Sequence, residues 1–216
     1  MPETMQERQP GRRRRRREDT IREILTIATE LMADHGVAAL SLSDIARRLG
    51  IQPPSLFRYV PSKLALYDAL FAEGARQVLA AFRSTAGEAE PGLPALRAGL
   101  TALARFVLAN PVFGQLLFWR PVPGFTPSPA SFRPAEDFVA AVRAVLRDAA
   151  GRGHLHPDAA SEEGHALLSV LFAGALTQQL ANEPGAALED GRFTRLLPRL
   201  ISMFAAAYPP PGEPPP

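Results

Sequence analysis

The sequence predicts an all-α protein in which an N-terminal three-helix unit is followed by a larger helical body. Its 216 residues are 46% apolar, which is enough for one large or two small domains with a hydrophobic core. Apolar residues recur three and four positions apart from Thr20 onward, and this helical spacing continues from residue 93. Two short candidate helices within residues 41–60 are joined by a turn containing Gly50, as in a helix-turn-helix.

Composition narrows the classes of function. The chain has no cysteine, which excludes disulfides and thiolate metal or redox sites. No apolar run approaches the ~18 residues of a membrane span, and the basic residues near the start precede no apolar signal region. The sequence contains no Gly-rich phosphate loop, GxSxG or HExxH. We therefore expect a cytoplasmic protein that is not an enzyme, with no cofactor, metal or membrane partner.

The opening segment, residues 1–17, is polar and charged and is expected to be a disordered basic arm. Residues 1–63 carry 12 basic and 8 acidic side chains, whereas the remainder carries 12 and 14. The excess of basic over acidic side chains in residues 1–63 comes from six consecutive arginines: Arg12, Arg13, Arg14, Arg15, Arg16 and Arg17. Arginine is well shaped to bind phosphate, so a nucleic-acid arm is one interpretation and a solubilising tail is another. No apolar face accompanies the run, which argues against a membrane patch.

Four helices are expected in the first third of the chain. The first runs from Thr20 to Gly36, where glycine favours a helix end. The second occupies residues 41–50 and is capped by Ser41. Prolines suit only a first helical turn, so a third helix is expected over Pro53–Tyr59. A longer fourth helix begins at residues 62–63 and extends to about residue 85.

The run SLSDIARRLGIQPPSLFRYVPSKLALYDAL resembles the DNA-binding domain of TetR-type transcriptional regulators. The resemblance covers residues 18–78, with the helix-turn-helix at about 41–60. It implies a homodimer whose DNA-binding heads are joined by the fourth helix to helical bodies, here residues 79–208. The bodies of this family bind a small effector and dimerise, so the implied partners are a double-stranded DNA operator, a second copy and an effector.

The resemblance also implies which residues contact DNA. Arg58 is the candidate for reading a guanine edge, and Tyr59 and Lys63 are candidates for phosphate contacts. Phe57 stands where tyrosine is common, so it is either a surface residue without that hydroxyl or a core aromatic. Val60 replaces a usual phenylalanine, and Gln52 should be a weak cap. Besides the arginine run, the candidates are Ser41, Gln52, Pro53, Ser55, Phe57, Arg58, Tyr59 and Lys63.

The body is expected to contain helices at 93–109, 111–119, 134–151, 158–182 and 192–207. Residues 120–134 hold five prolines and are expected to be a loop that forms a pocket wall or lid. Aromatic residues cluster around this loop, with Phe132 inside it. They either line a pocket for an apolar or aromatic effector or fill the core. The pocket candidates are Phe106, Phe113, Phe118, Trp119, Phe125, Phe138 and Phe172.

Small residues within 169–184, together with the helix within 193–208, are expected to form the self-association surface. The Pro-rich residues 209–216 are expected to be disordered. The favoured function is a repressor that an effector releases from its operator. The alternative is an architectural DNA-binding protein whose body has no ligand pocket, and an enzyme on a helical scaffold is poorly supported.

Overall fold

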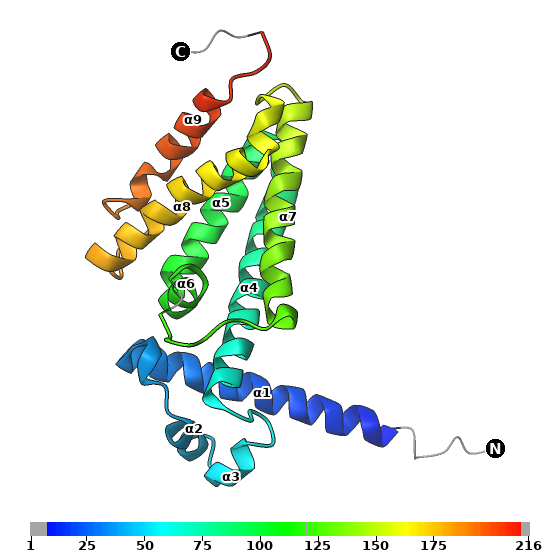
Figure 1. Ribbon diagram of the computed structural model, residues 1–216, viewed down its shortest axis with the longest axis vertical. Helices are drawn as coiled ribbons and strands as arrows, with labels where there is room; N and C mark the ends of the chain where they lie inside the picture. Colours follow the sequence, from blue (N-terminus) through cyan, green and yellow to red (C-terminus); the bar gives the residue numbers. More distant parts are fainter. Residues whose placement is uncertain (1–7, 120, 213–216) are drawn as a thin grey trace, which may run out of the picture.

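The computed structural model describes residues 8–119 and 121–212, and every regular element in these ranges is a helix. The α-helices pack as a small head beneath a larger body (Figure 1). The α-helices are α1 (Arg8–His35), α2 (Leu42–Arg48), α3 (Pro53–Leu56), α4 (Lys63–Glu88), α5 (Leu93–Ala109), α6 (Pro111–Phe118), α7 (Pro129–Gly151), α8 (Glu162–Asn182) and α9 (Leu197–Ala207). Short 3-10 turns are η1 (Val37–Ala39), η2 (Pro157–Ala160) and η3 (Thr194–Leu196).

The head forms because α1, α2, α3 and the first half of α4 bury one apolar face each. Ile24 and Ala28 of α1, Ile45 of α2, Leu56 of α3 and Leu66 of α4 are almost fully buried. The same core also takes in residues from α6 and the segment after it: Val112, Phe113, Leu116, Val122 and Phe125. The head is therefore packed directly against the lower end of the body.

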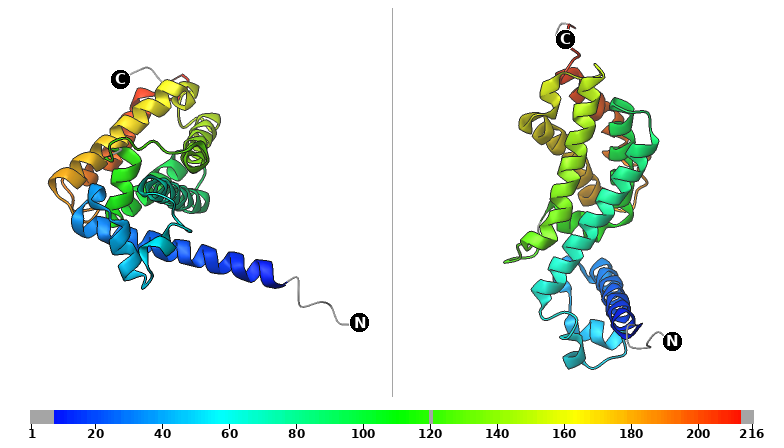
Figure 2. Two further views of the ribbon diagram at one scale, coloured as in Figure 1. Left: turned by 60° about the horizontal axis from the view of Figure 1, so that its bottom comes forward. Right: turned by 90° about the vertical axis from the view of Figure 1, so that its right-hand side faces the viewer.

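Helix α4 passes from the head into the body without a break at residue 78, where the sequence suggested a domain boundary. In the body it lies beside α5 and α7, while α8 and α9 form the outer layer (Figures 1 and 2). The buried body core is built from all of these helices and includes Phe82, Leu96, Leu146, Leu176 and Phe204. Such burial of apolar side chains is the main stabilising term for a helical fold of this size.

The loop expected at 120–134 is shorter in the structure, because its last residues belong to a helix. Helix α7 starts at Pro129, because Ser128 caps it and a proline is well suited to the first helical turn. The carboxylate of Asp68 on α4 accepts hydrogen bonds from the Ser128 amide (2.7 Å) and from the hydroxyls of Ser128 (2.8 Å) and Ser131 (2.7 Å). Pro134 lies inside the helix, where its backbone has no N–H and one intrahelical hydrogen bond is therefore missing.

Two further helix predictions need correction at their starts. The expected helix 158–182 is divided, since Ser161 caps α8 and leaves η2 as a separate turn. The expected helix 192–207 is likewise η3 followed by α9. The predicted limits of α5 are confirmed.

The arginine run is also helical rather than disordered, so this expectation is wrong for residues 8–17. Arginine is a good helix former, and extending an existing helix costs far less than nucleating a new one. Arg14 pairs with Glu18 one turn later, at 2.8 Å. The N-terminal half of α1 consequently projects beyond the rest of the molecule (Figures 1 and 2). The expectations for residues 1–7 and 213–216 lie outside the described residues.

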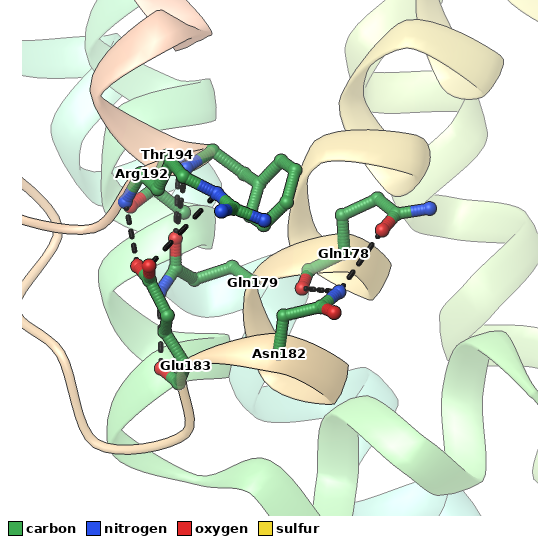
Figure 3. A network of polar contacts seen from close by, with 7 residues as sticks. Gln178, Gln179, Asn182, Glu183, Arg192 and Thr194 are labelled. Carbon is green, nitrogen blue, oxygen red and sulfur yellow. Dashed lines mark hydrogen bonds and ion pairs between the residues drawn. The ribbon is translucent and has the colours of Figure 1, made fainter.

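A polar network fixes the segment between α8 and α9 (Figure 3). Gln179 of α8 is fully buried, and its Oε1 accepts hydrogen bonds from the amides of Phe193 (3.0 Å) and Thr194 (3.3 Å). Its Nε2 donates to the Glu183 carbonyl at 3.0 Å, and the Glu183 carboxylate accepts from the Arg192 amide at 2.9 Å. The network therefore sets where α9 begins relative to the end of α8.

Within the described ranges, no single helix is both long and apolar enough to cross a membrane. Helices α5 and α6 together have the length and apolar content of a membrane span, but the pair is bent by 111°.

Candidate nucleic-acid interface

Helix α2 is held in the head by its cap and its inner face. The Ser41 hydroxyl accepts a hydrogen bond from the Asp44 amide at 3.3 Å, which confirms the predicted cap. Ile45 and Ala46 are fully buried, and the Ala46 carbonyl accepts the Ile51 amide at 3.0 Å on the far side of the turn. Gly50 in that turn has φ 71°, a conformation that glycine adopts without strain.

Helix α3 is shorter than predicted and ends at Leu56 instead of Tyr59. Gln52 occupies the cap position without a side-chain hydrogen bond, which confirms the predicted weak cap. The helix is positioned mainly by Leu56, which is 1% exposed and whose carbonyl accepts the amides of Tyr59 (2.9 Å) and Val60 (3.0 Å). A tight turn therefore continues α3 and brings residues 57–59 to the surface.

The outer side of α3 and this turn carries most of the predicted DNA-contacting residues. Gln52, Pro53 and Arg58 are exposed, and Ser55 is half-buried. Phe57 is 50% exposed, so the alternative that it is a core aromatic is wrong. Helix α3 and this turn lie at the end of the molecule farthest from the body (Figure 1).

Arginines in the head differ in how they are paired. Arg47 contacts Asp44 at 2.7 Å, and Arg48 contacts Glu30 at 3.3 Å and Asp34 at 3.6 Å, which ties α2 to α1. Arg58, by contrast, pairs with no carboxylate of the described residues and keeps its guanidinium available at the surface.

Arg17 links the arginine run to the recognition turn. Its Nη1 donates to the Arg58 carbonyl at 2.9 Å, and its guanidinium lies 5.6 Å from the centre of the Tyr59 ring. Such a cation–π contact adds about 0.5–1 kcal/mol at an exposed site. No local pattern in the sequence signals this link, because it joins positions 41 residues apart.

Lys63 at the start of α4 is partly engaged within the head. Its Nζ donates to the Ala38 carbonyl at 3.1 Å and lies 5.8 Å from the Tyr67 ring centre. The Tyr67 hydroxyl donates to the Val37 carbonyl at 2.7 Å, and desolvation by burial raises the pKa of this tyrosine. Ser62 caps α4 by accepting the Ala65 amide at 3.1 Å. Lys63 is nevertheless exposed, so its ammonium group remains accessible beside the start of α4.

The head matches a known family of DNA-binding domains. Residues 24–70 match the family described as bacterial regulatory proteins, tetR family. The head of this chain therefore belongs to this family of DNA-binding domains. The HTH-type transcriptional regulator Rv1816 of Mycobacterium tuberculosis is 34% identical over 128 residues, or 55% of this chain. The HTH-type transcriptional regulator Mb1846 of Mycobacterium bovis matches to the same extent, and the chain spans about half (52%) of the length of each relative.

Solved structures show that the fold of the tetR family extends through the body. A TetR family transcriptional regulator, PfmR from Thermus thermophilus, is 21% identical with a TM-score of 0.64, covering 84% of this chain and 96% of that one. The fatty acid degradation regulator FadR from Bacillus halodurans is 14% identical with a TM-score of 0.66, covering 85% and 96%. At these identities the likeness concerns the fold.

The body contains a small, mainly apolar cavity between α5, α6, α7 and α8. Its volume is about 120 Å³. Among the predicted pocket residues, Phe118, Phe138 and Phe172 line it. The other lining residues were not predicted to border a pocket, because neither buried aliphatic positions nor small or polar positions nearer the surface carry a signal that marks a cavity: Leu100, Leu103, Val142, His165, Leu168, Ser169 and Ala173.

The other predicted pocket residues lie elsewhere. Phe106 and Phe113 stack with centroids 6.2 Å apart where body meets head. Trp119 donates from Nε1 to the Thr177 hydroxyl at 2.9 Å, and Phe125 packs 5.9 Å from Tyr67 in the head core. Proximity in sequence grouped these rings, but α6 separates them, since its start packs on the head and its end reaches the cavity.

His165 is the one titratable group on the cavity wall among the described lining residues. Desolvation by burial, and secondarily the positive charge of Arg143, lower the pKa of His165 below its usual 6.5. The imidazole is therefore neutral near pH 7 and offers the cavity one donor or acceptor, beside the Ser169 hydroxyl.

Proposed function

We propose that this protein is a sequence-specific DNA-binding transcriptional regulator, acting as a repressor that a small effector releases from its operator. The observation that carries the proposal is the outer surface of α3 and the following turn. There a helix-turn-helix presents exposed Gln52, Pro53 and Arg58. In such a unit the second helix enters the DNA major groove.

Within this surface, Arg58 is the side chain suited to specificity. Its exposed guanidinium has the fork geometry that binds O6 and N7 of guanine, a contact worth about 1–3 kcal/mol of base discrimination. Ser41, Tyr59 and Lys63 flank it and supply donors for phosphate oxygens, which position the head without reading sequence. The exposed Phe57 has no hydroxyl and offers only apolar contact.

The proposed active form is a homodimer built through α8 and α9. These outer helices expose apolar side chains that a monomer leaves in water, including Val170 (69% exposed) and Met203 (54% exposed). Burying them against a second copy supplies a hydrophobic driving force. A two-fold dimer also places two heads on half-sites about 34 Å apart or a multiple of it.

The proposed effector is a small apolar or aromatic molecule that enters the body cavity. Helix α6 joins this cavity to the head, because Phe118 lines the cavity while Val112 and Phe113 lie in the head core. A ligand larger than about 120 Å³ that binds wholly between these helices requires the cavity walls to part. That movement reaches the head through α6 and through α4, which runs through both parts.

The architectural alternative is favoured by one observation, the small size of the cavity. Ligand pockets usually measure about 300–1,000 Å³, well above the volume found between these helices. An architectural protein would bind DNA with little sequence preference and would not respond to effectors.

DNA binding tests the proposal. Fluorescence anisotropy compares a duplex from upstream of the protein's own gene with a scrambled duplex of equal length, using wild type, Arg58→Ala and Arg83→Ala. Arg83 is an exposed arginine of α4 in the body and controls for lost charge. We expect only Arg58→Ala to reduce the preference, by about 5- to 150-fold for each head that is bound, and by the square of that factor for a dimer on two half-sites. Equal binding of both duplexes by wild type would instead support the architectural alternative.

A further inference from the structure

The helical arginine run presents two chemically different faces. At about 100° per residue, Arg13, Arg16 and Arg17 share one face with Thr20, whereas Arg14 and Arg15 point to the other side. The Nε of Arg14 donates a hydrogen bond to the Glu18 carboxylate at 2.8 Å. A disordered arm would make these six residues equivalent, but a helix does not.

The inward face borders a hollow with the recognition turn. This hollow is lined by Arg13, Arg16, Arg17, Asp19, Thr20, Glu23 and Tyr59. Three arginines therefore line the same hollow as Tyr59, the one aromatic residue that the helix-turn-helix contributes to the described lining. Arg17 connects the two walls through its 2.9 Å hydrogen bond to the Arg58 carbonyl and its position over Tyr59.

Two carboxylates also line the hollow, and they do not cancel its positive charge. Asp19 is paired with Arg22 at 2.7 Å, so its charge is largely met within α1. Glu23 lies a further turn along the helix, at the end away from the arginine run. The part of the hollow beside Tyr59 is therefore dominated by arginine.

We propose that Arg13, Arg16 and Tyr59 form a phosphate-binding clamp for the DNA backbone, with Arg17 holding the clamp to the recognition turn. The inference rests on the proposed function, because it places this hollow beside the same duplex that α3 reads. Arginine and a phenolic hydroxyl together supply several donors that suit phosphate oxygens. Arg17 is a positioning residue here, since its own hydrogen bond is made to the protein.

The test compares two double variants of equal net charge. Arg13→Gln with Arg16→Gln alters the inward face, and Arg14→Gln with Arg15→Gln alters the outward face. All four side chains are exposed, so neither variant disturbs the core, and circular dichroism checks that both stay helical. Binding is measured across a salt series on the upstream duplex and on the scrambled duplex.

Each lost phosphate contact lowers the steepness of log affinity against log salt by about 0.9. We expect the inward double variant to show this decrease in salt dependence, doubled if a dimer places two clamps on DNA. The outward double variant should show a smaller decrease. Tyr59→Phe should weaken binding about 2- to 12-fold with an unchanged slope, because a neutral hydrogen bond releases no counterion.

Equal slopes for the two double variants, or a Tyr59→Phe variant that binds like wild type, would overturn the clamp. Because phosphate contacts do not depend on sequence, the comparison also holds on the scrambled duplex. A wild type that shows no preference between the duplexes would count against the proposed regulator, while leaving the slope comparison decisive for the clamp.

Discussion

Replacing Gln179 with methionine tests how the outer helices of the body are fixed. Methionine resembles glutamine in length and shape but neither accepts nor donates the hydrogen bonds of an amide. The wild-type side chain is fully buried and serves two amides, those of Phe193 and Thr194, and the carbonyl of Glu183 (Figure 3). The variant leaves all three backbone groups without this partner.

The expected loss follows from these three groups. A buried polar group without a partner costs about 1–3 kcal/mol. Thr194 is 1% exposed and bears that cost, while Glu183 and Phe193 lie nearer the surface, where water replaces part of the bond. We therefore expect the free energy of unfolding to fall by about 2–4 kcal/mol, equivalent to about 4–16 °C in Tm for a chain of this size.

Urea denaturation at one fixed protein concentration measures this change, since the stability of a dimer depends on concentration. Gln178→Met is the control, because Gln178 is exposed and its amide is bonded only to Asn182 on the same helix. The control should stay within about 0.5 kcal/mol of wild type. If Gln179→Met also stayed within that range, the network would not be what holds α9 to α8.

Three other changes have defined outcomes. Leu56→Ala removes the fully buried side chain of α3 and should lower the free energy of unfolding by about 2–5 kcal/mol, as measured by thermal unfolding. It should also abolish DNA binding, and a stable variant that still binds DNA would contradict this. Burial opposes ionisation of Asp68, but hydrogen bonds from Ser128 and Ser131 outweigh it and lower its pKa below the usual 3.8. The contribution of ionised Asp68 to stability is therefore complete above pH 3.8 and is lost as pH falls through the lower pKa of the folded state. Asp68→Asn should lower the free energy of unfolding, measured by urea denaturation, at about pH 7 but much less at about pH 2, and an equal loss of stability at both pH values would refute this. Benzene, which fits a cavity of this size, should raise the Tm of wild type but not of Ala173→Leu, whose side chain fills the space; equal shifts would contradict this.

The head was more predictable from sequence than the body, for physical reasons. Its short helices are bounded by local signals, such as the Ser41 cap and the turn at Gly50, and these act over three or four residues. Even there, the sequence did not reveal that α1 extends through the arginines. Charge repulsion suggested disorder, but a continuing helix and the contact of Arg17 with Arg58 and Tyr59 outweigh it.

The body depends on contacts between distant residues, and these leave little local trace. Asp68 lies 60 residues before Ser128, yet its carboxylate meets the start of α7. The aromatic cluster predicted one pocket, whereas the fold divides those rings among the cavity, the head core and the junction between them. Aromatic content therefore indicated burial for Phe113, Phe125 and Phe172, but not for Phe118 and Phe132, which are exposed, and it did not indicate which space each ring borders.

Selection of DNA from a random duplex library tests the central claim most directly. The wild-type protein is bound to the library, and the retained duplexes are sequenced over successive rounds. A sequence-specific dimeric regulator should enrich one motif, arranged as an inverted repeat whose half-sites are one or more helical turns apart. Retained duplexes without any shared motif would contradict the account and leave only binding to the DNA backbone.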